Sequence, residues 1–396
     1  MRRLRSVVLP FCTVLIAVLL FSCATAVPPK LPEQEVGPVH EETVQEQAAP
    51  ARLTVVFGGD VMAHTENTSM DDYSQIWQAV ARDIQDGDLA FANLETPVTD
   101  TLPYRSYPAF NIHSEYADAA VQAGFNVLSL CNNHTNDQKL AGIRSTQSWA
   151  DSRPVQAAGL REKGQPLSYR YFEKNGWRIL FLPITEILNS TVAADYINYV
   201  PADGRSREEF ISYAAQLRRT HPADLFVIGV HTHEPEYVRT ISEPQRAFYL
   251  ELIDRAGADV IWANHPHVVK PWEILSRDGT ARKLIMYANG NTVSGQRRDP
   301  RFDAPETARD YTGDGCLIRA VFTKPSDPAD NTGIILDSVA CTFITTYIDP
   351  SGHFILRRLD DACIQELRSS GRNVWADYLE ARKTIMERIK GTTTCR

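Results

Sequence analysis

The chain lacks the cysteine patterns of a redox protein or a structural zinc protein. Its 396 residues include seven cysteines, and no two of them form a C-x-x-C pair, which argues against a zinc ribbon or a redox motif. It also lacks an excess of positive charge, because 41 basic residues against 49 acidic ones give a formal net charge of −8. Such a surface repels nucleic acid, and we expect no nucleic-acid partner. An anionic substrate would need a locally positive pocket, which bound metal ions can supply.

The first residues have the pattern of a secretory signal peptide. Three arginines precede an apolar run from Val7 to Phe21, which is short for a membrane-spanning helix. The run ends in Leu20-Phe21-Ser22-Cys23-Ala24, which resembles the bacterial lipobox. We therefore predict a lipoprotein signal peptide over residues 1–22 and lipidation of Cys23. The alternative is an uncleaved signal anchor in which this cysteine has no role.

The segment that follows lacks the residues needed for a core. Residues 24–50 contain five prolines and no aromatic side chain, a composition that cannot bury enough apolar surface to fold. We predict a disordered, flexible Pro/Glu/Gln-rich tether over residues 23–51, which holds one folded domain, residues 52–396, away from the membrane. The predicted location is the cell envelope, outside the cytoplasm, with the membrane as a partner through the lipid anchor.

From Arg52 onward, short apolar runs rich in Val, Ile and Phe alternate with amphipathic stretches. This alternation predicts an α/β fold with a largely buried sheet. The predicted strands are 53–58, 89–92, 127–130, 178–182, 225–230, 260–262 and 284–288, and the predicted helices include 73–85, 114–123, 207–220 and 244–256. Hairpins are predicted at 167–182, turning at Asn175-Gly176, and at 341–359, with an amphipathic helix at 374–389.

Polar clusters follow six of the predicted strands. They are Gly59-Asp60, Asn93-Leu94-Glu95, Asn132-Asn133-His134, His231-Thr232-His233, Asn264-His265-Pro266-His267 and Asn289-Gly290-Asn291. The carboxyl ends of strands in α/β sheets are where sites are built. The sequence therefore places these clusters along one rim of the domain.

The side chains on this rim are suited to binding a catalytic metal. They offer the carboxylates of Asp60 and Glu95, the amide of Asn133, and the imidazoles of His134, His231, His265 and His267. Mixed nitrogen and oxygen ligands without cysteine suit zinc, manganese or iron. We expect one or two divalent ions, and two ions about 4 Å apart can activate water and stabilise displacement at phosphorus. His134 could then protonate the leaving oxygen.

The order of these motifs resembles the CapA family, which is implicated in poly-γ-glutamate capsule synthesis. The motifs are Gly59-Asp60-Val61-Met62, Asn93-Leu94-Glu95, Asn132-Asn133-His134 with Asp137, His231 with Glu236-Tyr237, and Ala256-Gly257-Ala258-Asp259-Val260-Ile261 running into His265-Pro266-His267-Val268. They lie between residues 53 and 291. The family is similar to calcineurin-like metallophosphoesterases, and the resemblance implies a four-layer αββα sandwich with a dinuclear metal site.

The resemblance also implies a role for each motif residue. Asp60 matches the first metal aspartate, Glu95 the bridging carboxylate, Asn133-His134 the Asn-His pair, His231 the isolated metal histidine, and His265 with His267 the closing pair. The phosphoesterase pattern Asp-x-His has Met62 in place of its histidine, and Glu95 stands where an aspartate is usual. Both departures look characteristic of the CapA branch, and they put phosphatase activity in question.

Four further side chains are additional candidates for the site: His64, His233, Glu236 and Asn291. His64 lies four residues after Asp60 and would supply the imidazole missing from Asp-x-His. His233 would share a face with His231 if the strand continues that far. Asn291 either forms a turn or faces the pocket. For Asp137 we expect a cap on the following helix.

The leading hypothesis is a membrane-anchored lipoprotein that takes part in synthesis or export of an extracellular anionic polymer, with a metal-dependent hydrolase site of the phosphoester type. Its expected partners are the anionic polymer or a phosphoester substrate, the membrane, and membrane proteins of capsule synthesis. One alternative is a non-enzymatic envelope protein with a degenerate metal site that binds polymer or a partner. Another is a metal-dependent amide or peptide hydrolase.

Overall fold

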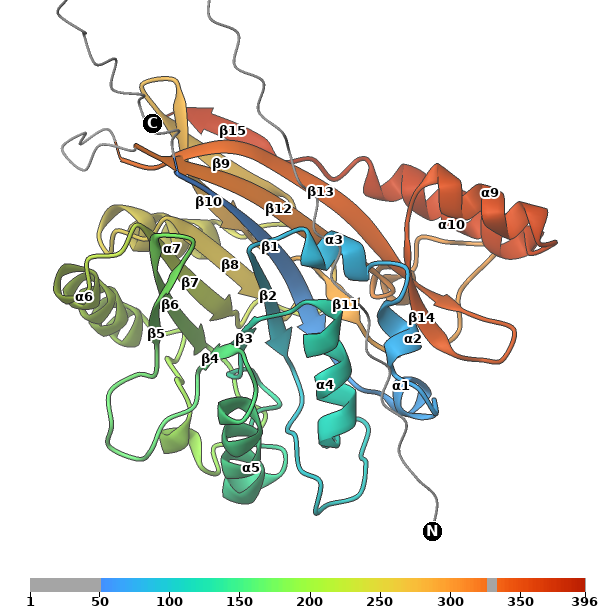
Figure 1. Cartoon of the computed structure of the whole chain (residues 1–396), viewed down its shortest axis with the longest axis horizontal. Coiled ribbons are helices and arrows are strands. Elements are labelled where there is room, and N and C mark those ends of the chain that lie inside the picture. The colour runs from blue at the N-terminus through green and yellow to red at the C-terminus, as the bar shows by residue number, and fades with distance from the viewer. Residues whose placement is uncertain (1–50, 326–332, 396) are drawn as a thin grey trace, which may run out of the picture. The chain divides into compact units, whose positions relative to one another are not determined.

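The computed structural model describes residues 51–325 and 333–395. The predicted signal peptide, Cys23 and the predicted tether lie outside these residues, except for Ala51, which begins the first strand. The described part forms two β-sheets with helices beside them (Figure 1), which confirms the predicted mixed α/β class. Within the described residues, no helix has the length and apolar character needed to cross a membrane.

The first sheet has eight strands. Its order is β14 (Phe354–Arg358), β13 (Ile335–Ile348), β12 (Asp314–Lys324), β1 (Ala51–Val61), β2 (Leu89–Leu94), β3 (Val127–Ser129) and β4 (Gln156–Ala158), and β11 (Asn291–Val293) also pairs with β1. Strands β1 to β4 and β11 run parallel, whereas β12 pairs antiparallel with β1. The carboxyl ends of β1, β2 and β3 therefore meet at one edge.

The second sheet has seven strands. Its order is β15 (Thr392–Cys395), β9 (Trp272–Arg277), β10 (Thr280–Met286), β8 (Val260–Asn264), β7 (Leu225–His231), β6 (Trp177–Thr185) and β5 (Arg170–Lys174). Strands β6, β7, β8 and β10 run parallel. Strand β5 joins β6 through the predicted hairpin turn, where Asn175 and Gly176 both have positive φ, as a two-residue turn of this kind requires.

An aromatic-rich core joins the two sheets. Phe57 and Phe91 of the first sheet pack on Phe181 and Trp262 of the second, with ring centroids 4.8 Å apart for Phe57–Phe91, 5.2 Å for Phe91–Phe181 and 5.7 Å for Phe91–Trp262. All four side chains are fully buried, and burying each contributes about 1.5–3 kcal/mol or more. This core fixes the sheets face to face.

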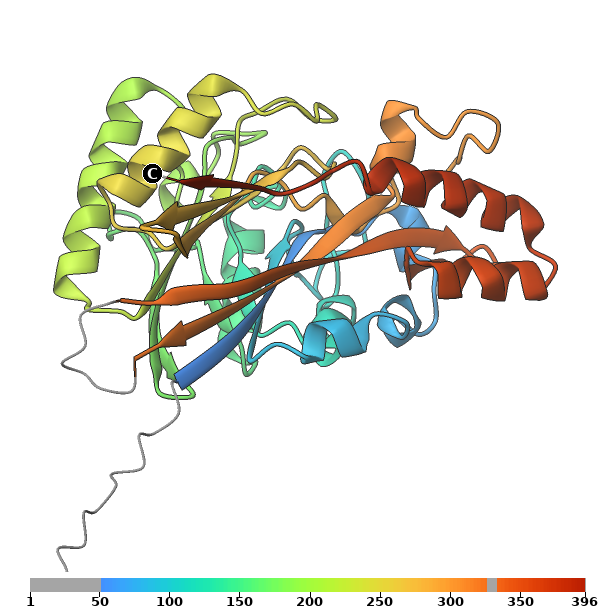
Figure 2. The ribbon, with the colours of Figure 1, turned by 90° about the horizontal axis from the view of Figure 1, so that it is seen from above.

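Helices cover the outer faces of both sheets. On the first sheet lie α1 (Thr65–Thr68), α2 (Ser74–Trp77), α3 (Ala81–Gln85), α4 (Ser114–Ala123) and α5 (Lys139–Asp151), and the apolar side chains of α2 to α5 pack against β1 to β4. On the second sheet α6 (Gly204–Thr220) and α7 (Glu243–Asp254), lime green and yellow in Figure 2, pack against β6 to β8. A single 3-10 turn, Ala194–Tyr196, precedes α6.

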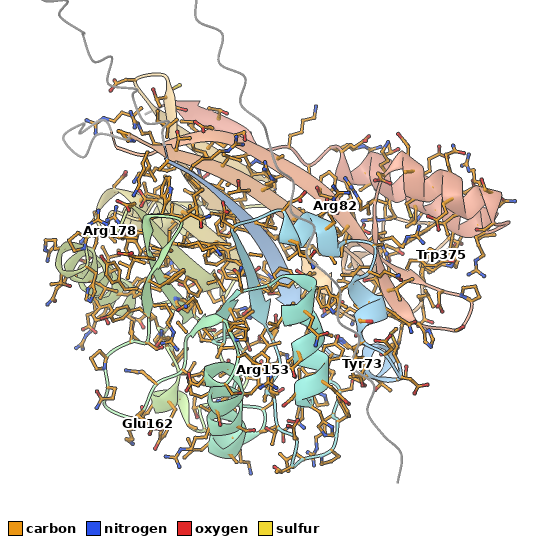
Figure 3. All side chains as sticks on the ribbon, viewed as in Figure 1. Tyr73, Arg82, Arg153, Glu162, Arg178 and Trp375 are labelled. Carbon is orange, nitrogen blue, oxygen red and sulfur yellow. The ribbon has the colours of Figure 1, made fainter. Side chains whose placement is uncertain are left out.

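The C-terminal part adds three helices, α8 (Ala308–Tyr311), α9 (Asp361–Ser369) and α10 (Asn373–Met386). Helices α9 and α10 contribute to the core between the sheets. Trp375, near the start of α10 (Figure 3), lies 4.9 Å from the ring of Tyr347 in β13. The predicted helix 374–389 is thus found within one to three residues of its expected bounds.

Several predicted boundaries are wrong. Strands β2 and β8 each end two residues later than predicted, and the first strand of the predicted hairpin at 167–182 is β5, which begins at Arg170. The predicted helix 73–85 is two short helices, α2 and α3, although Ile76, Trp77, Val80 and Ile84 are all buried as a helical pattern requires. Strand β1 continues to Val61, so Asp60 lies inside the strand instead of after it. Cys341 and Cys363, which flank the predicted hairpin, form no disulfide with each other, because both thiols are free.

Candidate metal centre

The first sheet supplies the carboxylates of the site. In the ladder of β1, Asp60 lies opposite Asn93 of β2 and Asn291 of β11. Asn93 Nδ2 donates to Asp60 Oδ1 at 2.8 Å and to Glu95 Oε2 at 3.3 Å. All three side chains are buried. The amide of Asn93 therefore holds two carboxylates side by side at the end of the sheet.

The second sheet supplies the imidazoles. His231 ends β7, and opposite it Asn264 ends β8 and leads into His265-Pro266-His267. His265 and His267 have φ values of 103° and 56°, a region that costs non-glycine residues about 1–3 kcal/mol each. Tyr237, with φ 67°, donates its N–H to the Pro266 carbonyl at 2.9 Å. The strained turn aims both histidine rings at the carboxylates.

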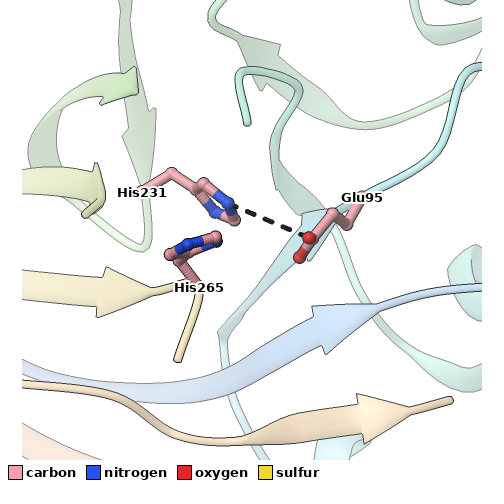
Figure 4. Close-up of side chains that lie close together, drawn as sticks. All are labelled: Glu95, His231 and His265. Carbon is pink, nitrogen blue, oxygen red and sulfur yellow. Dashed lines mark ion pairs between the residues drawn. The ribbon is translucent and has the colours of Figure 1, made fainter. Parts of the chain in front are cut away.

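These side chains form three groups that could hold a metal ion. They are Asp60, Glu95 and His267; Glu95, His231 and His265; and Glu236, His265 and His267, with the ligand atoms of each group within 4.8 Å of one another. Figure 4 shows the second group, in which His231 Nε2 lies 3.8 Å from Glu95 Oε1. Glu95 belongs to the first two groups, as a bridging carboxylate would.

Two buried atoms at the centre fit a cation. Glu95 Oε1 and His265 Nδ1 are buried and have no hydrogen-bond partner among the described residues. An unpartnered buried polar atom costs about 1–3 kcal/mol, and both atoms are metal-ligand types. The residues present therefore fit divalent metal ions, which would satisfy both atoms.

The electrostatics of the protein without metal agree with this fit. Burial and the neighbouring Asp60 carboxylate raise the pKa of Glu95 well above 4.5. Burial and the neighbouring imidazoles of His265 and His267 lower the pKa of His231 well below 6.5. Burial and His267 lower the pKa of His265 to about 4. The low pKa values keep His231 and His265 neutral, which is the form that binds metal. Burial alone would lower the pKa of His267, but its hydrogen bond to Asp60 raises it. A bound cation would relieve the repulsion between Glu95 and Asp60.

His134 lies beside this centre and forms a dyad with Asp137. Its Nδ1 lies 2.7 Å from Asp137 Oδ2, and the same oxygen accepts the Phe110 N–H at 2.7 Å. The expectation that Asp137 caps the next helix is wrong, because α5 has Gln138 at its N-cap. The carboxylate holds the Nδ1 proton of His134, which leaves the proton-accepting lone pair on Nε2, 3.5 Å from the amide nitrogen of Asn189.

Two predicted amides lie beside these three groups, which consist of His, Asp and Glu side chains. Asn133 Oδ1 lies 2.8 Å from His231 Nε2, and Asn291 Oδ1 lies 3.0 Å from His267 Nδ1. Both amide oxygens face imidazoles of the ligand groups, and ligation by Asn133 stays a prediction. His233 points away, because its Nδ1 lies 3.1 Å from Glu186 and its side chain is 39% exposed.

His64 lines a cavity in front of the centre. The cavity measures about 530 Å³ and also includes Met62, His134, Glu236, Tyr237 and His267, together with Arg298 and Arg309 from the C-terminal part. Burial and the charges of His267 and His134 lower the pKa of His64 to about 3. Met62 contributes a thioether where the phosphoesterase pattern has an imidazole, so the cavity wall has one nitrogen ligand fewer.

Sequence reasoning missed Glu186, which supports the His231 loop. Its carboxylate pairs with Arg207 at 2.6 Å and His233 at 3.1 Å, and its N–H donates to the His231 carbonyl at 2.8 Å. Burial alone would raise the pKa of Glu186, but the hydrogen bond from His233 and the charge of Arg207 lower it. Glu186 directly follows β6, so the strand-end rule that found the other clusters would also have found it.

Comparisons with known proteins agree with the motif order. Residues 54–296 match the family described as bacterial capsule synthesis protein PGA_cap. The chain is 28% identical over 259 residues to the capsule biosynthesis protein CapA of Bacillus anthracis, across 62% of this chain and 60% of that protein. It is 29% identical over 257 residues to the PGA biosynthesis protein CapA of Bacillus subtilis (strain 168), across 62% and 64%.

The matched region thus spans less than two thirds of either relative. A solved structure titled "Structure of PhoD" is similar with a TM-score of 0.40 and 12% identity, across 86% of this chain and 80% of that chain. The family match covers more than half of the 396 residues and includes every candidate ligand from Asp60 to Asn291. The chain therefore belongs to the bacterial capsule synthesis protein family PGA_cap.

Proposed function

We propose that this chain is a cell-envelope lipoprotein, lipidated at Cys23, that takes part in synthesis or export of an extracellular anionic polymer such as poly-γ-glutamate through metal-dependent hydrolysis. The names of the two Bacillus relatives support the capsule role. The observation that carries the hydrolytic part is the pair of unpartnered buried ligand atoms, Glu95 Oε1 and His265 Nδ1. Two facing sheets with outer helices support a four-layer αββα metallophosphoesterase-like domain.

The residues divide the chemical work among them. Asp60, Glu95 and His267 would hold one divalent ion, and Glu95, His231 and His265 a second, with manganese, zinc or iron as the suitable metals. Such ions activate water and stabilise charge on the transferred group. His134, protonated on both ring nitrogens with its Nδ1–H held by Asp137, would give its Nε2 proton to the leaving oxygen and be left as the neutral Nδ1–H tautomer.

The proposal is tested on the purified full-length protein. Metal per chain is measured first, and hydrolysis of a generic phosphodiester and of γ-glutamyl polymer is then followed with added Mn²⁺ or Zn²⁺. Asp60→Ala and His265→Ala are expected to lose both metal and activity. A parent protein without stoichiometric metal would refute the enzymatic proposal, and activity unchanged in both variants would show that the site lies elsewhere.

The His134–Asp137 dyad allows a separate prediction. Asp137→Asn removes the carboxylate that fixes the His134 tautomer, so we expect kcat to fall about 100-fold or more, with KM and metal content close to those of the parent. Steady-state kinetics and metal analysis check this. Asp118→Asn is the matched control, because Asp118 pairs with Arg153 outside the cavity. A loss of kcat in the control of similar size would contradict the assignment.

One observation favours a non-enzymatic alternative. Met62 lines the cavity where the phosphoesterase pattern has a ligand. In that case the chain would bind metal and polymer but would hydrolyse neither the phosphodiester nor the γ-glutamyl polymer. Stoichiometric metal, polymer binding and no turnover with any added metal would together favour the binding protein over the hydrolase.

A further inference from the structure

We propose that His64 is a substrate-binding residue of the cavity, whose Nε2–H donates a hydrogen bond to an anionic oxygen of the bound substrate, and that it is not a metal ligand. The inference rests on the proposed function only in taking the cavity in front of the metal centre as the place where substrate binds. Its substrate class is an oxyanion, such as a phosphoryl or carboxylate group.

A backbone amide fixes the tautomer of His64. The Gly295 N–H donates to His64 Nδ1 at 3.1 Å. An amide N–H can only donate, so Nδ1 must carry a lone pair, and the neutral ring then carries its proton on Nε2. Nε2 has no hydrogen-bond partner within residues 51–325 and 333–395, and it is not among the buried unpartnered atoms. The Nε2–H is therefore a donor available to the cavity that the ring lines.

The ring is also held in place. A Cβ on residue 295 would lie 2.6 Å from His64 Cβ, so only glycine allows the amide to come this close. The His64 N–H donates to Asn67 Oδ1 at 3.0 Å, and the Phe110 ring meets the imidazole edge-on at 5.1 Å. A donor fixed in this way loses little conformational entropy when a ligand binds.

His64 and His134 present opposite tautomers to the same cavity. Phe110 contacts both rings, at 5.1 Å and 4.7 Å, with interplanar angles of 75°. His134 holds its proton on Nδ1 through Asp137 and so presents its proton-accepting lone pair on Nε2. His64 holds its proton on Nε2 and can only donate there. One imidazole thus moves a proton, and the other binds an oxygen.

The same contacts argue against metal ligation by His64. Its Nδ1 lone pair is already taken by the Gly295 amide, and its Nε2 is protonated in this arrangement. His64 also belongs to none of the three ligand groups found among the described residues. The imidazole therefore does not replace the missing histidine of Asp-x-His as a ligand, although it lies in the same cavity as Met62.

Two substitutions separate the roles of the two nitrogens. His64→Asn keeps a polar atom near Nδ1 and removes the Nε2 donor, whereas His64→Gln places an amide N–H near the Nε2 position. Binding of inorganic phosphate is measured by calorimetry on the full-length protein as purified and again with Mn²⁺. We expect His64→Asn to weaken phosphate binding roughly 10- to 100-fold, as loss of a bond to a charged group does. His64→Gln should recover most of the affinity.

Metal content and melting temperature complete the test. Both variants are expected to keep the metal content and the fold of the parent, and His353→Asn, in the loop before β14, is the matched control with unchanged phosphate binding. Loss of metal in His64→Asn to the extent seen in His265→Ala would make His64 a ligand and overturn the inference. Parent-like phosphate binding in His64→Asn, or no phosphate binding by the parent, would also overturn it. Phosphate binding that depends on His64 in a protein without hydrolytic activity would refute the proposed hydrolase and leave this inference standing.

Discussion

Glu95→Gln is expected to weaken metal binding strongly and at the same time to make the metal-free protein more stable. Glu95 Oε1 is buried without a partner, and Asp60 places a second carboxylate beside it. A neutral amide removes the repulsion between the two groups. Because it also removes the carboxylate shared by two ligand groups, we expect metal affinity to fall more than about 100-fold. Metal analysis and melting of the chelator-treated proteins measure the two effects.

The stability gained in the metal-free Glu95→Gln variant should increase with rising pH. Burial and Asp60 raise the folded-state pKa of Glu95 well above the value of 4.5 expected for an unfolded chain. Below pH 4.5 the residue is protonated in both states, so the substitution changes little there. As the pH rises from 4.5 through the raised pKa, the metal-free parent loses stability and the variant does not. A gain in melting temperature that shrinks with rising pH would contradict the explanation.

Glu186→Gln is the matched control, because it makes the same change in a buried carboxylate whose charge is compensated by neighbouring groups. Arg207 and His233 compensate the charge of Glu186 and hold its pKa below the usual value in spite of burial. We expect the amide to destabilise the protein by about 1–3 kcal/mol, with metal bound as in the parent. If Glu95→Gln raises the stability of the metal-free protein and Glu186→Gln lowers it, the two results distinguish a metal-ligand carboxylate from a structural one.

Much of the site could be predicted because parallel strands bring their carboxyl ends to one edge. Asp60, Glu95, His231 and His265 follow from that rule together with the choice of nitrogen and oxygen ligands. The role of Asp137 could not be predicted, because an aspartate three residues after His134 and just before a helix could either cap that helix or pair with the histidine. Only the fold shows that Phe110 and His134 share its Oδ2.

The part of the cavity wall that follows the last motif, Asn289-Gly290-Asn291, could not be predicted from the sequence either. Gly295, Arg298 and Arg309 lie more than 230 residues from His64 in the sequence, and no local pattern connects them with it. The last two lie beyond residue 296, where the family match ends. Their place depends on how the C-terminal part packs on the domain, where Arg297, Asp314 and Arg382 form a buried ion cluster.

Asp314→Asn should therefore be the most destabilising of the substitutions considered. Asp314 Oδ1 lies 2.8 Å from Arg297 Nη1, and its Oδ2 lies 2.6 Å from Arg382 Nη2. All three side chains are at most 1% exposed. The substitution leaves two buried guanidinium groups without a carboxylate, which costs about 3–5 kcal/mol. Urea unfolding measures the change, and Asp337→Asn on the exposed face of β13 should stay within about 0.5 kcal/mol of the parent.

The pH dependence again tests the cause. Burial alone would raise the pKa of Asp314, but the charges of Arg382 and Arg297 lower it below 3.8. The stabilisation by Asp314 is therefore fully present above about pH 3.8 and is lost as the pH falls through the lower folded-state pKa. The difference between parent and variant should be constant at neutral pH and should shrink in acid. A difference that persists unchanged at low pH would point to altered packing instead of lost charge pairing.

The effect of this substitution should extend to the cavity. Arg297 connects the segment that carries Gly295 to Thr345 and Asp314, and the Gly295 amide fixes the tautomer of His64. If Arg297 loses its carboxylate, the position of that amide is no longer determined by a buried ion pair. We therefore expect Asp314→Asn, at a temperature where it is still folded, to weaken phosphate binding while the metal centre, built from residues 60 to 267, keeps its metal. Weakened metal binding with unchanged phosphate affinity would contradict this connection between the C-terminal ion cluster and the cavity.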